Sequence, residues 1–160
     1  MNSIFNEQII PYVGNESFKF GMSEQEVIEV IKAERMSYRE WTDPHKGCTP
    51  EIPWKYVEVD NSITFCFVED TLFEIVFENC YEGTLPNGIG IGLSMEEALN
   101  KDPSISFNDE DEDYVSKEGY WIEDDTFSGK VVSITVFVPQ AEDAQEFFSY
   151  KWISDYKVEK

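Results

Sequence analysis

The sequence offers one pairing of residue types suited to covalent catalysis, a histidine followed three residues later by a cysteine. Such a pair works only if the histidine is held beside the thiol as its base. His45 and Cys48 lie in a segment that also contains Pro44 and Gly47, which are typical of a surface loop. We therefore interpret His45 as an ordinary loop histidine, and we predict no catalytic residues and no enzymatic activity.

Residue types that hold metals or cofactors occur without the spacing that such sites need. Cys48, Cys66 and Cys80 are odd in number and include no C-x-x-C pair, which indicates reduced thiols rather than a disulfide framework or a zinc site. The glycines between residues 83 and 92 lack the full dinucleotide-binding spacing and the lysine of a P-loop. We predict no metal and no cofactor.

An acidic run from Asn108 to Asp113 begins like a calcium-binding loop. Counted from Asp109, however, Tyr114 stands where the loop requires glycine and Tyr120 where it requires the bidentate glutamate. The run is therefore interpreted as a solvated acidic loop. With 33 acidic residues in the chain, a pair of carboxylates elsewhere carries little information about acid–base catalysis.

The charge of the chain restricts its partners. Its 33 Asp and Glu and 12 Lys and Arg give a net charge of −21, which both halves share: residues 1–83 hold 16 acids and 6 bases, and residues 84–160 hold 17 and 6. Nucleic acids and anionic membranes carry the same sign, so neither is an expected partner, whereas a basic protein is. The 15% aromatic content favours a folded globule over a disordered acidic chain.

Two copies of one helix-start motif divide the chain. Gly-Met-Ser-x-x-Glu at residues 21–26 aligns with Gly-Leu-Ser-x-x-Glu at residues 92–97, an offset of 92 − 21 = 71 residues. In each copy the serine is predicted to be the N-cap, and the glutamate three residues later is predicted to bond back to the N–H of the cap. The motif therefore predicts one helix near the start of each half.

Strand-like segments follow each motif. They span residues 55–59, 63–68 and 72–77 in the first half and residues 105–107, 119–123 and 130–138 in the second, with residues 108–118 as an acidic insertion. A short helix is predicted within residues 141–156, where Phe147, Phe148 and Trp152 have roughly helical spacing. The predicted fold class is α+β: two tandem helix-plus-antiparallel-meander repeats, residues 1–83 and 84–160, form one compact unit with helices on one face of the sheet or sheets.

Alternation along the strands predicts which face is buried. The apolar face would be formed by Ile63, Phe65, Phe67, Phe73, Ile75 and Phe77 in the first half and by Tyr120, Ile122, Val132, Ile134 and Val136 in the second. The opposite face would carry Thr64, Cys66, Glu74, Glu78, Trp121, Glu123, Ser133, Thr135 and Phe137. A polar face with exposed aromatics suits a partner, but Trp121 and Phe137 would equally suit packing under a loop or the C-terminal segment.

The repeated Gly-[Met/Leu]-Ser-x-x-Glu motif followed by a meander resembles the tandem architecture of β-lactamase inhibitor proteins and of the small lipoprotein of the outer-membrane β-barrel assembly machinery. It is also similar to immunity proteins of contact-dependent growth inhibition systems. The resemblance covers about residues 9–138. It implies a binding role through the open sheet face or the loops. In contrast to the secreted inhibitors, the sequence predicts no signal peptide and no paired cysteines, and in contrast to the lipoprotein it predicts no lipobox.

These observations predict a cytoplasmic bacterial protein that binds and inhibits a basic partner, most concretely an immunity protein against a toxin domain such as a nuclease. The alternative is a non-enzymatic scaffold or small-molecule-binding module, and exposed edge strands would also allow a homodimer. The hypothetical partner-binding residues are Asp109, Glu110, Asp111, Glu112, Asp113, Tyr114, Trp121, Glu123, Asp124 and Asp125.

Overall fold

The computed structural model describes residues 3–43 and 52–157, so the predictions for His45 and Cys48 lie outside the described residues. The elements in chain order are α1 (Glu24–Ala33), β1 (Arg39–Asp43), β2 (Trp54–Val59), β3 (Ile63–Val68), β4 (Thr71–Glu78), α2 (Met95–Lys101), β5 (Ser106–Asn108), β6 (Asp113–Ser116), β7 (Tyr120–Asp124), β8 (Val131–Phe137), the 3-10 helix η1 (Pro139–Glu142), α3 (Ala144–Ser149) and the 3-10 helix η2 (Lys151–Tyr156). The fold class is α+β, as predicted. None of the helices in this described part has the length and apolarity to span a bilayer.

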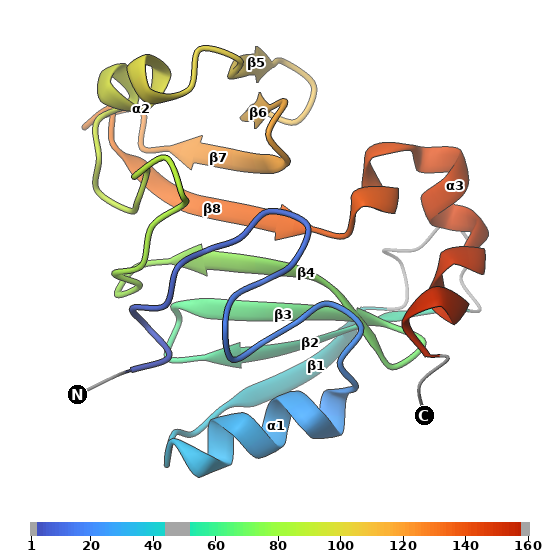
Figure 1. The fold of residues 1–160 in the computed structure, drawn as a ribbon. Helices are drawn as coiled ribbons and strands as arrows, with labels where there is room; N and C mark the ends of the chain where they lie inside the picture. The colour runs from blue at the N-terminus through green and yellow to red at the C-terminus, as the bar shows by residue number, and fades with distance from the viewer. Residues whose placement is uncertain (1–2, 44–51, 158–160) are drawn as a thin grey trace.

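All eight strands form one antiparallel sheet in the order β1-β2-β3-β4-β8-β7-β6-β5 (Figure 1). The strands of the first half and of the second half meet where β4 pairs with β8, with Glu74 opposite Phe137 and Phe77 opposite Ile134. The sheet is therefore continuous across the two halves. Each half contributes a helix followed by four strands.

The helix starts follow the predicted chemistry with one difference. Ser23 accepts a hydrogen bond from the Glu26 N–H at 3.1 Å, and the Glu26 carboxylate accepts from the Ser23 N–H at 2.9 Å, so the capping box is complete. Ser94 accepts from the Glu97 N–H at 3.2 Å, but the Glu97 carboxylate lies 3.5 Å from the Ser94 hydroxyl instead of bonding to the backbone. The second helix thus keeps the cap without the reciprocal bond.

Two turns close hairpins of the first half. Asp60 and Asn61 join β2 to β3, and Glu69 and Asp70 join β3 to β4, all with φ between 46° and 57°. Two consecutive residues with positive φ match the twist of the strands that they connect. The three-stranded meander predicted over residues 55–77 is present, with β1 added at its edge.

The structure adds two strands that the sequence pattern did not predict, β1 and β6. β6 lies inside residues 108–118, the segment interpreted as an acidic insertion, and pairs with both β5 and β7. Four of the five residues of β1 are exposed, and only the fifth, Asp43, is part-buried, so the strand lacks the apolar alternation that marks a half-buried strand.

The prediction of one core residue, Val132, was wrong. Val132 is 41% exposed, and Val131 is buried in its place. Glu123 of β7 pairs with Ser133 of β8, but the next pair is Asp124 with Val131. The register therefore shifts at this point and skips Val132. A bulge of one residue on β8 reverses which side chains face the core beyond it.

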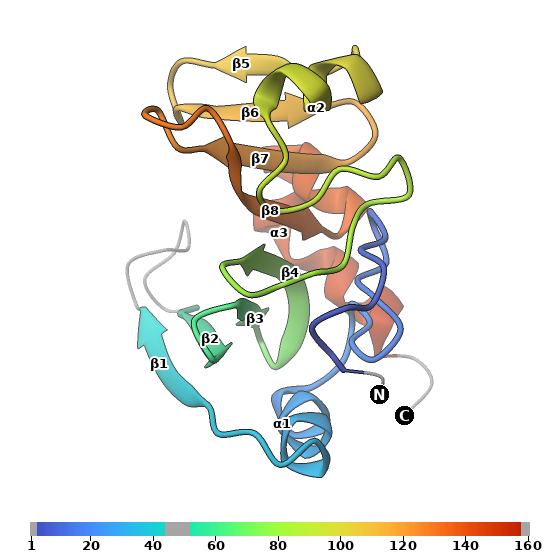
Figure 2. The same ribbon diagram turned by 90° about the vertical axis from the view of Figure 1, so that its left-hand side faces the viewer.

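The N-terminal segment, residues 3–20, covers one face of the sheet over β3 and β4 (Figures 1 and 2). Phe18 packs on Phe65 of β3 with ring centres 4.4 Å apart, and both rings are fully buried. Val27 and Ile31 of α1 and Met95 and Ala98 of α2 belong to the same buried cluster as the strand side chains. This face of the sheet is the core of the molecule.

Candidate functional site

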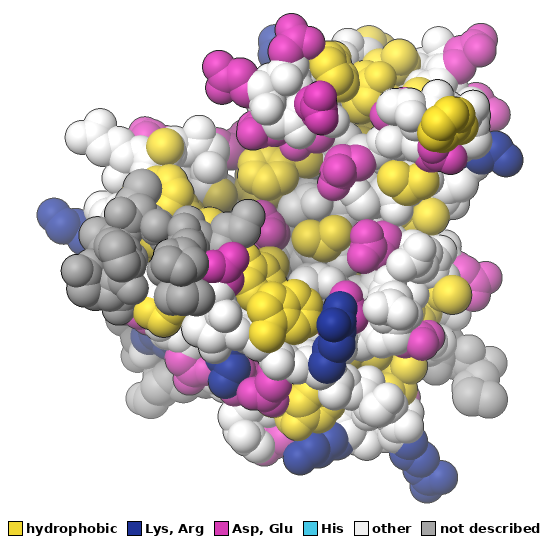
Figure 3. Space-filling model, turned by 180° about the vertical axis from the view of Figure 1, so that it is seen from behind, with side chains coloured by type: hydrophobic (Ala, Val, Ile, Leu, Met, Phe, Trp, Pro, Cys, Tyr) yellow, Lys and Arg dark blue, Asp and Glu magenta, His cyan; other side chains and the backbone are white. Residues whose placement is uncertain are grey.

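The opposite face of the sheet is hollowed (Figure 3). Its hollow has a volume of about 790 Å³ and runs across the sheet from β1 to the β5–β6 hairpin. We call this site the hollow. It is lined by Trp41, Asp43, Trp54, Tyr56, Thr64, Cys66, Glu74, Val76, Asn108, Asp111, Asp113, Val115 and Trp121.

Strand register brings these side chains to one face. Trp41 pairs with Tyr56, Tyr56 with Cys66, and Cys66 with Glu74, so one row of side chains crosses four strands. A parallel row runs from Thr64 through Val76 and Thr135 to Trp121 and Val115. Because directly opposed residues share a face, the two rows form the floor and walls of the hollow.

Aromatic rings stand on both sides of the hollow. Trp41 and Tyr56 stack with ring centres 5.2 Å apart and planes 11° from parallel. On the other side, Trp121 packs on Phe137 with ring centres 4.5 Å apart. Phe137 is 2% exposed and belongs to the covered part of this face, whereas Trp121 is half-buried and lines the hollow. Thr135 and Ser133, also predicted for the open face, are buried as well.

Carboxylates lie on this face of the sheet, and two of them, Asp113 and Glu78, have raised pKa values. Burial, Asp111 and Glu123 raise the pKa of Asp113, and burial, Glu58 and Glu123 raise that of Glu78. Burial raises the pKa of the Tyr56 hydroxyl, and nearby Cys66, Glu74 and Asp43 raise it further. The electrostatic potential of this face is therefore negative and favours a cation.

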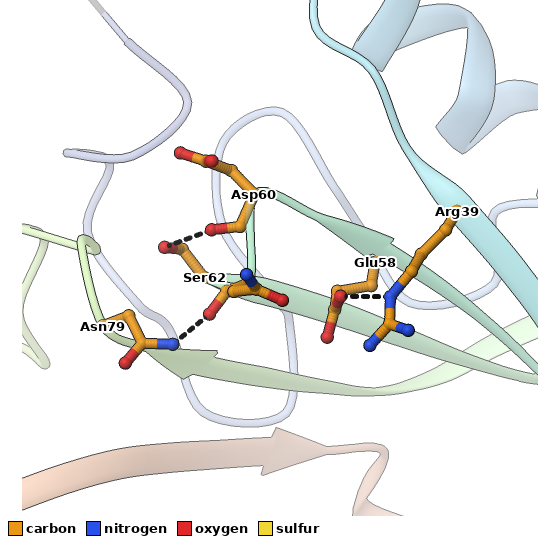
Figure 4. A network of polar contacts seen from close by, with 6 residues as sticks. Arg39, Glu58, Asp60, Ser62 and Asn79 are labelled. Carbon is orange, nitrogen blue, oxygen red and sulfur yellow. Dashed lines mark hydrogen bonds and ion pairs between the residues drawn. The ribbon is translucent and has the colours of Figure 1, made fainter.

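The rim of the face already shows how a cation is held there (Figure 4). Arg39 Nε lies 2.6 Å from Glu58 Oε1, and the Arg39 guanidinium carbon lies 4.9 Å from the centre of the Trp41 ring. Glu58 is 9% exposed, whereas the Arg39 side chain is mostly exposed. A carboxylate and an indole face therefore bind one guanidinium at the edge of the hollow.

The predicted partner-binding residues fall into four groups in the structure. Asp111, Asp113 and Trp121 line the hollow, and Glu123 shares the face of Trp121 because it is two residues further along β7. Asp109, Glu110 and Glu112 are exposed in the β5–β6 turn. Tyr114 lies on the other face, opposite Ile122, and packs edge-to-face on Phe107. Asp124 ends β7, and Asp125 accepts a hydrogen bond from the Phe127 N–H in the β7–β8 turn.

Sequence reasoning missed the half of the hollow formed by β1 and β2. Trp54 and Tyr56 alternate with Lys55 and Val57, so the period-2 pattern within residues 54–59 already indicated two aromatics on one face. Trp41 had no such signal, because its strand is recognisable only through its pairing with β2.

Comparison of the chain with protein-family models, with curated proteins and with solved structures finds no match.

Proposed function

We propose that the protein is a cytoplasmic binding inhibitor, an immunity protein that neutralises a basic toxin domain, such as a nuclease, through the hollow and its acidic rim. In this proposal the two helix-plus-four-strand halves are tandem repeats whose joined sheets form one binding face. The observation that carries it is the hollow itself: aromatic rings and carboxylates lie together on the sheet face that the N-terminal segment leaves open.

The physical argument rests on complementarity. A toxin that binds phosphates carries a basic surface, and carboxylates on the inhibitor can occupy the same positions. Aromatic side chains in a desolvated centre supply most of the binding energy of such interfaces, while acids at the rim raise the association rate. In this proposal the binding energy comes from Trp41, Tyr56 and Trp121. The association rate is raised by Asp109, Asp111 and Glu123.

A charge-matched pair of variants tests the proposal. Replacing Asp109, Asp111 and Glu123 by lysine changes the net charge from −21 to −21 + 6 = −15. The control variant replaces Glu16, Glu29 and Glu96, which are exposed on the N-terminal segment, α1 and α2, and has the same net charge. Binding to a panel of basic nuclease toxin domains is measured by calorimetry at low and physiological salt.

We expect the hollow variant to lose at least about 100-fold in affinity for a cognate toxin, because it brings like charges together, and the control to lose less than about fivefold. Equal losses in the two variants would show that only the net charge matters and would contradict an interface at this face. A panel in which no toxin domain binds, with growth protection absent on co-expression, would reject the immunity function.

The second candidate is a small-molecule-binding module. It is favoured by the volume of the hollow, about 790 Å³, which lies within the range of ligand pockets. In that case a small ligand would raise the unfolding temperature without any protein partner.

A further inference from the structure

The hollow has features that select a particular kind of cation. The Trp41–Tyr56 stack and Trp121 line its two sides, and no lysine or arginine occurs among its described lining residues. The negative faces of aromatic rings attract cations, and carboxylates beside the rings add to that attraction.

One carboxylate of the hollow has unused hydrogen-bonding capacity. Asp113 Oδ1 is inaccessible to solvent, and it accepts no hydrogen bond from any other described residue. A buried acceptor without a donor costs free energy, and a rotation of the part-buried Asp113 side chain that turns this oxygen towards a donor in the hollow would remove that cost. Asp111 lies beside Asp113 and adds a second negative charge. This corner of the hollow is therefore suited to a charged group with several N–H donors.

Metal binding does not fit this arrangement. Within residues 3–43 and 52–157, no cluster of three or more His, Cys, Asp or Glu side chains is placed to hold a metal ion. Ring faces also serve a flat organic cation better than a hydrated ion. The rim pair of Arg39 with Glu58 and Trp41 shows the relevant geometry, a guanidinium held by one carboxylate and one indole.

We propose that the hollow binds an arginine side chain presented by the protein partner, with the guanidinium beside the ring of Trp121 and its N–H groups donating to Asp113 and Asp111. Arginine fits better than lysine, because its planar guanidinium stacks on rings and carries five donors, whereas an ammonium is a compact and strongly hydrated charge. This inference rests on the proposed function, since it names the group on the toxin that the hollow recognises.

The test uses the whole protein and three short peptides, so it needs no toxin. The peptides are acetyl-Gly-Gly-X-Gly-Gly-amide with X as arginine, lysine or citrulline, the last being the uncharged analogue of arginine. The four tryptophans give four indole N–H signals in a ¹⁵N NMR spectrum, assigned by single Trp→Phe variants. Trp152 is the internal control, because it is 3% exposed and donates to the Phe147 carbonyl at 2.8 Å, away from the hollow.

We expect the arginine peptide to shift the Trp121 and Trp41 signals in a saturable way and to leave Trp152 unchanged. It should bind about fivefold or more tightly than the lysine peptide, and the citrulline peptide should give no saturable shift. Trp121→Leu should abolish the preference for arginine, whereas Phe127→Leu, at a 98% exposed aromatic outside the hollow, should not change it.

Equal affinity for arginine and lysine would overturn the proposal, as would shifts that include Trp152 or the absence of any saturable shift. These failures are distinguishable from failure of the proposed function. A toxin domain that binds the protein in a manner dependent on Asp109, Asp111 and Glu123, while the arginine peptide shows no preference, would retain the inhibitor and reject the arginine site.

Discussion

Asp102 contacts the last residue of β6 and Asp113 is its first residue, yet their surroundings shift the two pKa values in opposite directions. Asp102 is 2% exposed and accepts four hydrogen bonds, from the Ser104 N–H and from the hydroxyls of Ser104, Ser116 and Tyr120. Burial alone would raise its pKa, but these hydrogen bonds outweigh burial and lower the pKa to about 2. Asp113 has one buried oxygen without a donor among the described residues, and its pKa is raised.

The difference separates a carboxylate that holds the fold together from one that suits a ligand. Asp102 ends α2 and links it to β6 through Ser116 and to β7 through Tyr120, so its charge is stabilised within the molecule. The charge of Asp113 is opposed by Asp111 and Glu123, so it would be stabilised by a cation from outside. A carboxylate that destabilises the free protein and faces a hollow is a candidate for binding.

Replacing Asp102 by alanine has the largest expected effect. The substitution removes four hydrogen bonds to a charged acceptor and leaves the buried hydroxyls of Ser116 and Tyr120 without it, which should lower the free energy of unfolding by about 3 kcal/mol. Urea denaturation followed by circular dichroism measures this. Asp109→Ala, in the exposed β5–β6 turn, is the control and should change stability by less than about 0.5 kcal/mol. Similar losses in the two variants would remove the structural role of Asp102.

The pH dependence of stability separates the two kinds of carboxylate next. The pKa of Asp102 is lowered from 3.8 to about 2, so its contribution is complete above pH 3.8 and is lost as the pH falls towards 2, a loss of about 2 kcal/mol. The pKa values of Asp113 and Glu78 are raised above their ordinary values of 3.8 and 4.5. Their contribution to the free energy of unfolding is therefore present below these ordinary values and is lost as the pH rises through the raised ones.

Stability should therefore be greatest on the acid side of neutrality and fall steeply below about pH 4. Urea midpoints measured between pH 2 and pH 8 follow this curve. Asp102→Asn should flatten its acid side, and the double variant Asp113→Asn with Glu78→Gln should flatten the side towards neutral pH. The variant Glu118→Gln is measured as well, because contact with Asp102 raises the pKa of Glu118 and its titration therefore adds to the same curve. A curve that the double variant leaves unchanged would contradict the repulsion inferred between the carboxylates of this sheet face.

The sequence predicted the locally determined parts of this contrast and missed the non-local ones. Local patterns predicted the caps at Ser23 and Ser94 and the buried rows of β3 and β4, and the structure confirms them. The hollow depends on pairings between residues far apart in the chain, such as Glu74 with Phe137, which no local pattern encodes.

The acidic segment of residues 108–118 shows the same limit at single residues. Its composition identified Asp111 and Asp113 as candidates, but composition does not distinguish them from Tyr114, which the alternation of β6 turns towards the core. Nor does it separate Asp113 from Asp102, because the hydroxyls of Ser116 and Tyr120, which stabilise Asp102, become its neighbours only after β6 and β7 pair beside α2.

The smallest expected change in stability is a gain, opposite in sign to the loss expected for Asp102→Ala. It tests the difference between Asp102 and Asp113 most directly. Asp113→Asn keeps the size of the side chain and removes a charge that is repelled by its neighbours, so the free protein should become slightly more stable. The gain should be less than about 1 kcal/mol, because Asp113 is only part-buried and solvent screens the repulsion. The same variant should bind the arginine peptide several-fold more weakly, since one charged acceptor is gone. Urea denaturation and the NMR titration, each repeated on Asp109→Asn as the control, measure both quantities on one sample. A variant that loses stability and binding together would place Asp113 with Asp102 among the carboxylates that maintain the fold, whereas a gain in stability accompanied by loss of binding identifies it as a group whose charge serves the partner.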